Sequence, residues 1–455
     1  GISRSGWGML SKLPNRRAIF SWGLYDLANQ SFALLINTLL FSLFLKEAVL
    51  AGDQRGDLIW SLMGSVSLAL VVLLGPVLGA IADVQGSKKK FLVGSGFLCA
   101  GLTCGLALIP IAADSGIALS LMIAVALYVP ANLAFNIGEN FLGSFLPEIS
   151  SRETMGKVSA FGWTMGFVGA FLLLALTAAG SVLFQWNEPS KYRPLLFFAG
   201  VWFLVMMLPT IRYLPEGKAA AKGGEGRGAL VAGFRQLGRT AKEMGRYRDL
   251  SALLLALFIY GMGMQVVVFF AGVIARDDFG FSTTYLLLFS AVVTLTGGIG
   301  AAVTGLIQDR IGHQPTLLLF LGIWLLTAGG MAALSHFREV VEHPEKLQWA
   351  VWLIGNGLGL GLGGTGTATR ATVGVFTPAP RTGEFFNLWG ACFKLAGVVG
   401  LPVFGFVRTL WGSVPSLLVL TSFFGLGAVM LVALVRVERG IATAEEAESP
   451  SASPK

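Results

Sequence analysis

Long apolar runs fill most of this chain, and short polar segments separate them. A run of about 20 apolar residues can cross the hydrocarbon core of a bilayer as a helix. We predict twelve such spans, six in each half of the chain. The expected ranges are 18–46, 58–82, 91–112, 117–145, 157–184, 195–212, 249–275, 284–308, 315–335, 349–372, 384–408 and 413–436.

Two of the polar loops repeat one pattern half a chain apart. The first reads G-A-I-A-D-V-Q-G-S-K-K-K from Gly79, and the second reads G-L-I-Q-D-R-I-G-H-Q from Gly305. In each loop a Gly lies four residues before an Asp, and another Gly lies three residues after it. The repeat predicts two related halves of six spans, the usual plan of carriers that work by alternating access.

We interpret both loops as gating loops. Asp83 would face the positive end of a neighbouring helix and hold the halves together in the outward-facing state. The alternative is that the adjacent lysines only enforce topology. The residues assigned to the two loops are Gly79, Asp83, Gly86, Lys88, Lys89, Lys90, Gly305, Asp309, Arg310 and Gly312.

The predicted fold class is an all-α membrane protein with two pseudo-symmetric six-helix bundles. The expected parts are an N-terminal bundle at 1–212, a cytoplasmic linker at 213–248, a C-terminal bundle at 249–438 and a disordered cytoplasmic tail at 439–455. Leu230, Phe234 and Leu237 recur at helical spacing in the linker. They predict an amphipathic helix, either on the inner leaflet or solvated.

Composition and charge agree with a membrane protein. Apolar residues make up 54% of the chain and charged residues 13%, against about 25% charged in soluble proteins. The net charge is +8, and the basic residues gather on the side of both termini. That asymmetry predicts cytoplasmic termini and contact with lipid head groups, and it argues against a nucleic-acid partner.

The sequence contains no pattern typical of an enzyme. Cys99, Cys104 and Cys392 all fall within predicted spans, and the three histidines lie in or beside loops. A phosphate-binding loop, a nucleophile elbow and a zinc-ligand spacing are all missing from the sequence. We therefore expect no catalytic residue, no metal and no cofactor.

Three ionisable residues lie within predicted spans at compatible depths. A charged side chain inside a membrane costs free energy, and residues of this kind usually have a functional role. The three residues are Asp26, Glu139 and Lys394. We hypothesise that Asp26 and Glu139 take protons or bind a cationic group in a central cavity, and that Lys394 attracts an anionic group. The alternative is a structural role, in hydrogen bonds near the inner gate or in a pair with Lys394.

Other polar and aromatic residues are further candidates for the cavity wall. Asn132, Asn136 and Asn140 share one helical face because they are four residues apart. The complete list of these candidates is Tyr25, Asn29, Gln30, Asn132, Asn136, Asn140, Trp163, Tyr260, Gln265, Asn356, Asn387 and Trp389.

Glycine is concentrated in the tenth predicted span. Seven glycines fall between Gly355 and Gly366. Small residues let membrane helices approach closely, while glycine also weakens a helix. The pattern therefore fits either a helix that bends as the cavity opens or a helix that packs tightly.

The twelve spans and both copies of G-x-x-x-D-x-x-G resemble the major facilitator superfamily. Four short blocks resemble one branch of it, the bacterial relatives of the yeast vacuolar amino-acid effluxer linked to autophagy. These blocks are W-G-L-Y-D-L-A-N-Q-S-F from Trp22, F-L-P-E from Phe145, G-K-V-S-A-F-G-W-T-M-G-F from Gly156 and T-P-A-P-R-T-G-E-F-F from Thr377. Two departures are the absence of a basic run after Gly312 and of a proline in G-F-V-G-A-F from Gly166.

The resemblance implies a cavity between two bundles, lined by the first, fourth, seventh and tenth helices. We expect a monomeric carrier in a bacterial inner membrane that moves a small organic solute by alternating access, coupled to protons. An amino acid or short peptide suits the mix of Asp26, Glu139 and Lys394. The alternatives are an exporter of amphipathic drugs or lipids, and a non-transporting sensor or scaffold.

Overall fold

Twelve long helical segments follow one another in the order that the hydropathy pattern predicts. The structure is a computed structural model, and it describes residues 15–150, 154–216, 238, 242–340, 347–378 and 382–448. In the first half the segments are α2–η2 (Arg16–Gln30, Ser31–Leu39, Phe41–Phe44 and Leu45–Val49), α4 (Gly56–Gln85), α5 (Lys88–Leu106), α7 (Ile117–Ser144), α9 (Met155–Leu183) and α10 (Arg193–Tyr213). In the second half they are α12–η4 (Arg248–Val273 and Ile274–Asp278), α13 (Thr283–Ile311), α14 (His313–Val340), α15 (Gln348–Val375), α16 (Thr382–Trp411) and α17 (Ser413–Leu434).

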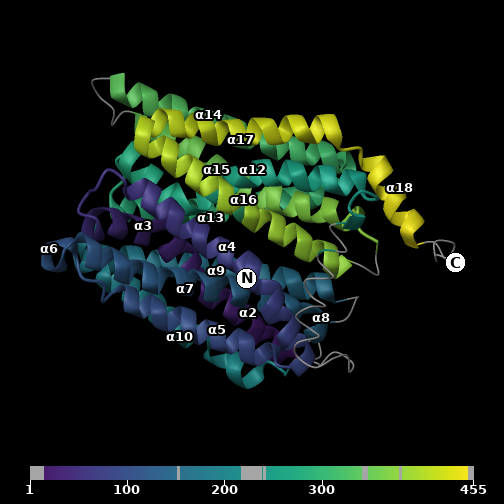
Figure 1. Cartoon of the computed structure of the whole chain (residues 1–455), viewed down its shortest axis with the longest axis horizontal. Helices are drawn as coiled ribbons and strands as arrows, with labels where there is room; N and C mark the ends of the chain where they lie inside the picture. The colour runs from purple at the N-terminus through teal and green to yellow at the C-terminus, as the bar shows by residue number, and fades with distance from the viewer. Residues whose placement is uncertain are drawn as a thin grey trace, which may run out of the picture.

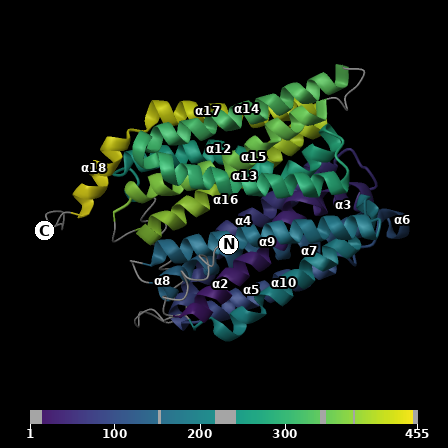
Figure 2. The same cartoon turned by 180° about the vertical axis from the view of Figure 1, so that it is seen from behind.

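The two halves form two helical blocks. Figures 1 and 2 show the purple-to-blue first half as one block and the teal-to-yellow second half as the other. In the first block α5 packs between α7 and α10, and in the second α15 packs between α13 and α14. Helix α4 packs on α16 and α9 packs on α13, so these two contacts join the blocks.

The helices have the length and composition of membrane spans. Among the described residues, nine helices are long and apolar enough to cross a membrane, and the bent pair Arg16–Leu39 and Phe41–Val49 makes a tenth. The remaining two long helices, α5 and α15, carry three lysines and a glycine run respectively. Both lie against spans of their own block, so all twelve belong to one membrane-embedded fold.

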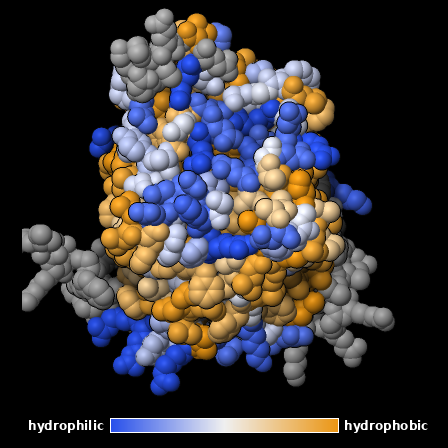
Figure 3. Space-filling model, turned by 90° about the vertical axis from the view of Figure 1, so that its left-hand side faces the viewer, coloured by the Kyte–Doolittle hydropathy of each residue, from blue (hydrophilic) through white to orange (hydrophobic). Residues whose placement is uncertain are grey.

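We call the two ends of the molecule the terminal side and the distal side. Helices α8 (Leu146–Ile149) and α18 (Val437–Glu448) mark the terminal side, where α10 ends and α12 begins. Helix α6 (Ala112–Ser115) marks the distal side, at the opposite end of the molecule in Figure 1. Figure 3 views the distal side, where hydrophilic residues occupy much of the centre and apolar residues flank them.

The repeated loop is built the same way in both halves. Gly86 caps α4 with a φ of 61°, and Gly312 caps α13 with a φ of 92°. Backbone with a positive φ is strained for residues with a side chain, which explains the glycine at the end of each pattern. The repeat therefore ends two equivalent helices.

Close packing accounts for the glycines of α15, which is an unbroken helix. Gly355, Gly359 and Gly363 face α13, where an added Cβ would meet Phe289, Thr296 and Gly297. Three more glycines, Gly357, Gly361 and Gly364, face Thr327, Trp324 and Phe320 of α14. Of the two interpretations, the structure favours tight packing over bending.

The tail differs from the sequence prediction. Residues 439–448, predicted to be disordered, belong to α18. Arg439 donates to both carboxylate oxygens of Asp249, at 2.6 and 2.8 Å, and the Arg436 amide donates to the same side chain at 2.7 Å. The helix forms because these bonds and the contact of Gly440 with Phe376 fasten it to α12 and α15. Most of the predicted linker helix lies outside the described residues.

Candidate functional site

Glu139 of α7 lies where the two blocks meet. It accepts a short hydrogen bond from Nδ2 of Asn29 on α2, and Gln30 Nε2 donates to Asn29 Oδ1 at 3.3 Å. The neighbouring Asn140 accepts a hydrogen bond of 2.9 Å from Nζ of Lys394 on α16. Within the described chain, no carboxylate lies within 4.0 Å of Lys394 Nζ, although its charge acts on Glu139. The arrangement thus brings together one carboxylate, one ammonium and three amides from three helices of both halves.

Asp26 lies beside this group, against α9. A Cβ placed on Gly166 would lie 3.1 Å from Asp26 Oδ2 and 3.7 Å from Gln30 Nε2. Because Gly166 has no side chain, the Asp26 carboxylate fits against α9 at this position. Asp26 is half-buried and makes no hydrogen bond or ion pair with the described residues. A carboxylate in this position can accept a proton or an ammonium group. We call Asp26, Asn29, Gln30, Glu139, Asn140 and Lys394 the central polar cluster.

Several other predicted cavity residues bond within a single half. Asn132 is fully buried, accepts from Asn37 at 3.0 Å and donates to Ser67 at 2.6 Å, and Asn136 donates to the Asn132 carbonyl at 2.8 Å. The other members with bonds inside one half are Tyr25 (to the Leu92 carbonyl), Tyr260 (with Thr369), Gln265 (to the Phe393 carbonyl) and Asn356 (to the Trp352 carbonyl). Asn387 is exposed. None of these hydrogen bonds reaches a residue of the central polar cluster.

The sequence interpretation overlooked Arg370, near the terminal end of α15. Its guanidinium carbon lies 5.5 Å from the ring centre of Trp163 on α9 and 5.6 Å from that of Trp389 on α16. Both tryptophans were candidates, and the cation between them joins the halves. A signal was available, because Arg370 falls inside the predicted span 349–372.

The gating loops make their described contacts within one half. Lys88 pairs with Glu148 of α8 at 2.9 Å, and Lys89 lies 4.0 Å from Glu216. Lys90, Asp309 and Arg310 are exposed, and the Asp83 side chain is outside the described part. A Cβ on Gly79 or Gly305 would meet nothing within 4 Å. The first Gly of each pattern therefore faces open space on the terminal side.

Charged residues connect the two halves on the distal side instead. Arg408 of α16 lies 3.2 Å from Asp57 of α4, Lys46 lies 2.5 Å from Asp277, and Arg276 lies 2.9 Å from Glu47. Arg408 also binds Asp278 within its own half, at 2.6 Å, and both side chains are nearly inaccessible. We call this group the distal charge cluster: Lys46, Glu47, Asp57, Arg276, Asp277, Asp278 and Arg408. Sequence reasoning missed it.

Below the distal charge cluster the halves remain in direct contact. Trp60 donates to the Phe269 carbonyl at 2.8 Å and Ser65 donates to the Val398 carbonyl at 2.6 Å. On α12, a Cβ at Gly272 would lie 2.5 Å from the Leu39 carbonyl oxygen of η1. On α4 and α16 these contacts run from Asp57 to Leu68 and from Arg408 to Gly397, which covers only the distal half of each helix.

Gly272→Ala should destabilise this distal contact, because the new methyl group meets backbone atoms that cannot rotate away. We expect a cost of about 1–3 kcal/mol, as for other overpacked sites. The measurement is the melting temperature in detergent. Gly79→Ala is the matched control and should leave it unchanged, since Gly79 has open space around it. An equal drop in both variants would contradict the assignment.

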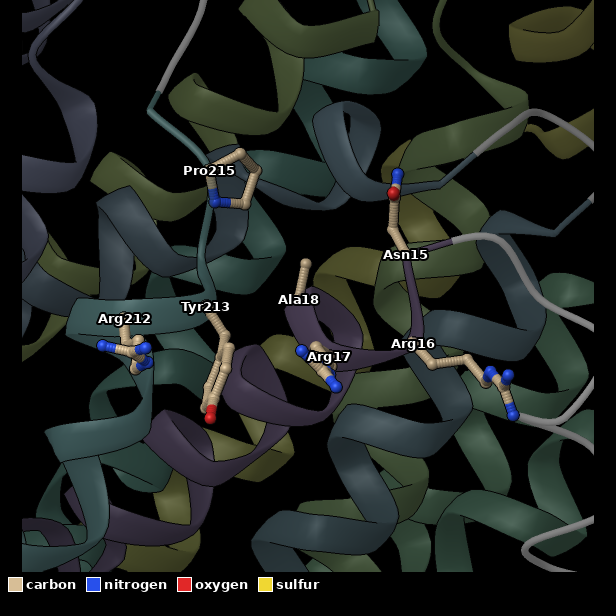
Figure 4. Close-up of a pocket in the computed structure, with 7 residues that line it drawn as sticks. All are labelled: Asn15, Arg16, Arg17, Ala18, Arg212, Tyr213 and Pro215. Carbon is tan, nitrogen blue, oxygen red and sulfur yellow. The ribbon is translucent and has the colours of Figure 1, made fainter.

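A surface pocket of about 460 Å³ lies elsewhere, at the terminal edge of α2 and α10. Figure 4 shows the side chains that line it: Asn15, Arg16, Arg17, Ala18, Arg212, Tyr213 and Pro215. Arg17 lies over the Tyr213 ring at 5.9 Å. The pocket contains no residue of the central polar cluster. Three guanidinium groups at a membrane edge suit anionic head groups.

Comparison with known proteins agrees with this architecture. The family model described as "Vacuole effluxer Atg22 like" matches residues 58–156 and 150–445. An uncharacterized MFS-type transporter of Bacillus subtilis is 24% identical over 422 residues, which is 90% of this chain and 93% of that protein. Autophagy-related protein 22 of Eremothecium gossypii is 22% identical over 482 residues, covering 94% and 93%. The chain spans about half the length of two relatives from Aspergillus niger and Penicillium rubens.

Among solved structures, the D-xylose–proton symporter aligns with a TM-score of 0.70 at 14% identity, over 93% of this chain and 98% of that one. At this identity the likeness concerns the fold alone. The family match, by contrast, extends over most of the chain. The chain therefore belongs to the vacuole effluxer Atg22-like family and is a membrane transporter of the major facilitator type.

Proposed function

We propose that this transporter moves a small zwitterionic solute, an amino acid or short peptide, by proton-coupled alternating access. The observation that carries the proposal is the central polar cluster, in which two acids and one base meet at the contact between the halves. A zwitterion offers an ammonium group to Asp26 and a carboxylate to a base. Charged groups placed at such a depth are costly unless they serve function.

The contacts between the halves support a terminal-open state for this structure. The distal charge cluster and the α4–α16 contact join the halves on the distal side. On the terminal side, the first Gly of each repeated loop faces open space. Exchange of solute across the membrane would then require the distal contacts to part and the loop contacts to form.

The charge distribution supports one orientation in the membrane. We propose that the terminal side is cytoplasmic in a bacterial inner membrane, with the protein acting as a monomer. Anionic lipids would be partners at the pocket of Arg16, Arg17 and Arg212. The protein would need no cofactor, and neither nucleic acid nor an enzymatic reaction enters this scheme.

A thermal-shift screen tests the proposed substrate class. Amino acids, dipeptides, sugars, lipids and cationic drugs are added to the purified protein at two pH values. A ligand that binds only the folded state raises the melting temperature by mass action. We expect stabilisation by a zwitterion, lost in Asp26→Asn and weakened in Lys394→Gln, which removes the positive charge that acts on Glu139. Stabilisation by lipids or drugs alone, unaltered in both variants, would favour an exporter of amphipathic compounds instead.

A further inference from the structure

Arg370 and two tryptophans form a site that the central polar cluster does not include. The guanidinium lies between the indole rings of Trp163 and Trp389, with distances of 5.5 and 5.6 Å from its central carbon to the ring centres. Trp163 comes from one half, while Arg370 and Trp389 come from the other. The side chains of Arg370 and Trp163 are exposed, and Trp163 belongs to α9, which packs on α13 of the opposite half.

The site lies within reach of the central polar cluster. Trp163 and Gly166 are three residues apart on α9, so they share one face and differ in height by about 4.5 Å. Gly166 is the residue that the Asp26 carboxylate covers. On α16, Trp389 and Lys394 are five residues apart, about 7.5 Å along the axis. Along the helix axes the two sites are therefore about 4.5–7.5 Å apart.

Arg370 gives the site a positive charge that no described residue neutralises in an ion pair. Within the described residues, Arg370 forms no ion pair or hydrogen bond. Nε1 of Trp389 is buried and has no hydrogen-bond acceptor among those residues. The two indole rings lie near the guanidinium, which carries five N–H donors in one plane. A planar carboxylate can accept two of these N–H groups side by side.

Lys394, the cation of the central polar cluster, is already engaged. Lys394 donates to Asn140 and its charge acts on Glu139. An added carboxylate would have to compete with both groups. Arg370 offers a permanent charge with no such competitor in the described part of the chain.

We propose that Arg370 binds the carboxylate of the transported solute between Trp163 and Trp389, while Asp26 receives its ammonium group. This inference rests on the proposed function and assigns one end of its substrate. Because the two indoles belong to different halves, an occupied site brings residues of both halves onto one ligand. Solute binding and the movement of the halves are thereby coupled.

The test compares three probes that differ only in their end groups. L-Leucine carries both groups, 4-methylpentanoate lacks the amine and isoamylamine lacks the carboxylate. Equilibrium binding to the purified full-length protein is followed by tryptophan fluorescence, since two tryptophans line the site. Arg370→Gln should weaken the binding of leucine and of 4-methylpentanoate by about 10- to 100-fold and leave the binding of isoamylamine unchanged.

Two further variants make the result specific. Arg370→Lys keeps the charge but loses the planar pair of donors, and should restore carboxylate binding only in part. Arg338→Gln is the matched control, because Arg338 also lies over an aromatic ring, Phe279, but near the distal side. It should bind all three probes as the unaltered protein does. A melting temperature for each variant shows that it is folded.

The outcomes separate this inference from the proposed function. Leucine binding that is equally tight in the unaltered protein and in Arg370→Gln overturns the role of Arg370 and keeps the transport of zwitterions. Equal weakening of all three probes in Arg370→Gln indicates a structural role for the residue and also overturns the inference. No binding of any amino acid or dipeptide to the unaltered protein overturns both.

Discussion

Asp57→Arg should open the distal side of the transporter. The carboxylate of Asp57 lies 2.6 Å from Lys46 Nζ and 3.2 Å from Arg408 Nε, so the variant would place three positive charges together. Like charges about 4 Å apart repel by about 4 kcal/mol at an effective dielectric of 20. Lys46 belongs to the same half as position 57, so only the repulsion from Arg408 of the other half is confined to the distal-closed state. This term alone should shift the equilibrium by about a thousandfold towards the distal-open state.

Cysteine labelling measures the shift. Cys99, Cys104 and Cys392 are first replaced by Ala, and Ser65→Cys is added on α4, where Ser65 bonds to Val398 of the other half. A membrane-impermeant maleimide added from the distal side should label this cysteine at least tenfold faster in Asp57→Arg. Unaltered labelling would mean that the distal charge cluster does not hold the halves together.

Asp53→Arg is the matched control for Asp57→Arg. It makes the same change of charge four residues earlier, in a loop where Asp53 pairs with Arg55 of its own half. Hydrogen bonds from Arg55 lower the pKa of Asp53 to about 2, so the carboxylate is charged in any practical assay. We expect the control to label at the original rate.

Glu139→Gln should abolish proton-driven accumulation and leave solute exchange intact. The amide keeps an oxygen for the hydrogen bond from Asn29, but it can neither release a proton nor carry a negative charge. The variant therefore resembles the protonated state. In vesicles, we expect accumulation under a proton gradient to fall at least tenfold, while counterflow of preloaded solute continues.

The comparison with Asp26→Asn assigns the proton carrier. Asp26 and Glu139 both belong to the central polar cluster, so either variant can alter proton coupling. Loss of accumulation only in Asp26→Asn would transfer the role to Asp26. Glu188→Gln, the same change at an exposed ion pair with Lys191, serves as the control. Accumulation that survives in both buried-site variants would refute proton coupling through this cluster.

Local patterns in the sequence predicted the features that depend on local geometry. Span number and order follow from hydropathy, and the repeated loop predicted two equivalent helix ends, which Gly86 and Gly312 form. For the central polar cluster, the sequence predicted that Asp26, Glu139 and Lys394 lie at compatible depths. It did not predict which side chains contact one another. Lys394 and Asn140, which form one of its bonds, are 254 positions apart.

Helical spacing identifies a face but not the helix that covers it. Asn132 and Asn136 share a face with Asn140, yet Asn132 and Asn136 bond inside the first half and Asn140 contacts the second. The distal charge cluster was missed because charges at helix ends look like ordinary topology signals. Its partners, such as Lys46 and Asp277, come together only in the folded chain.

The π-helical segment η1 also constrains where residues can be deleted from the first helix. Ser31–Leu39 is π-helical and separates Asn29, in the central polar cluster, from Lys46 and Glu47, in the distal charge cluster. Removing one residue from this stretch would rotate everything beyond it by roughly a quarter of a turn relative to Asn29. The two groups would then no longer face the second half together. Their shared orientation is therefore set by the phase of a single helix.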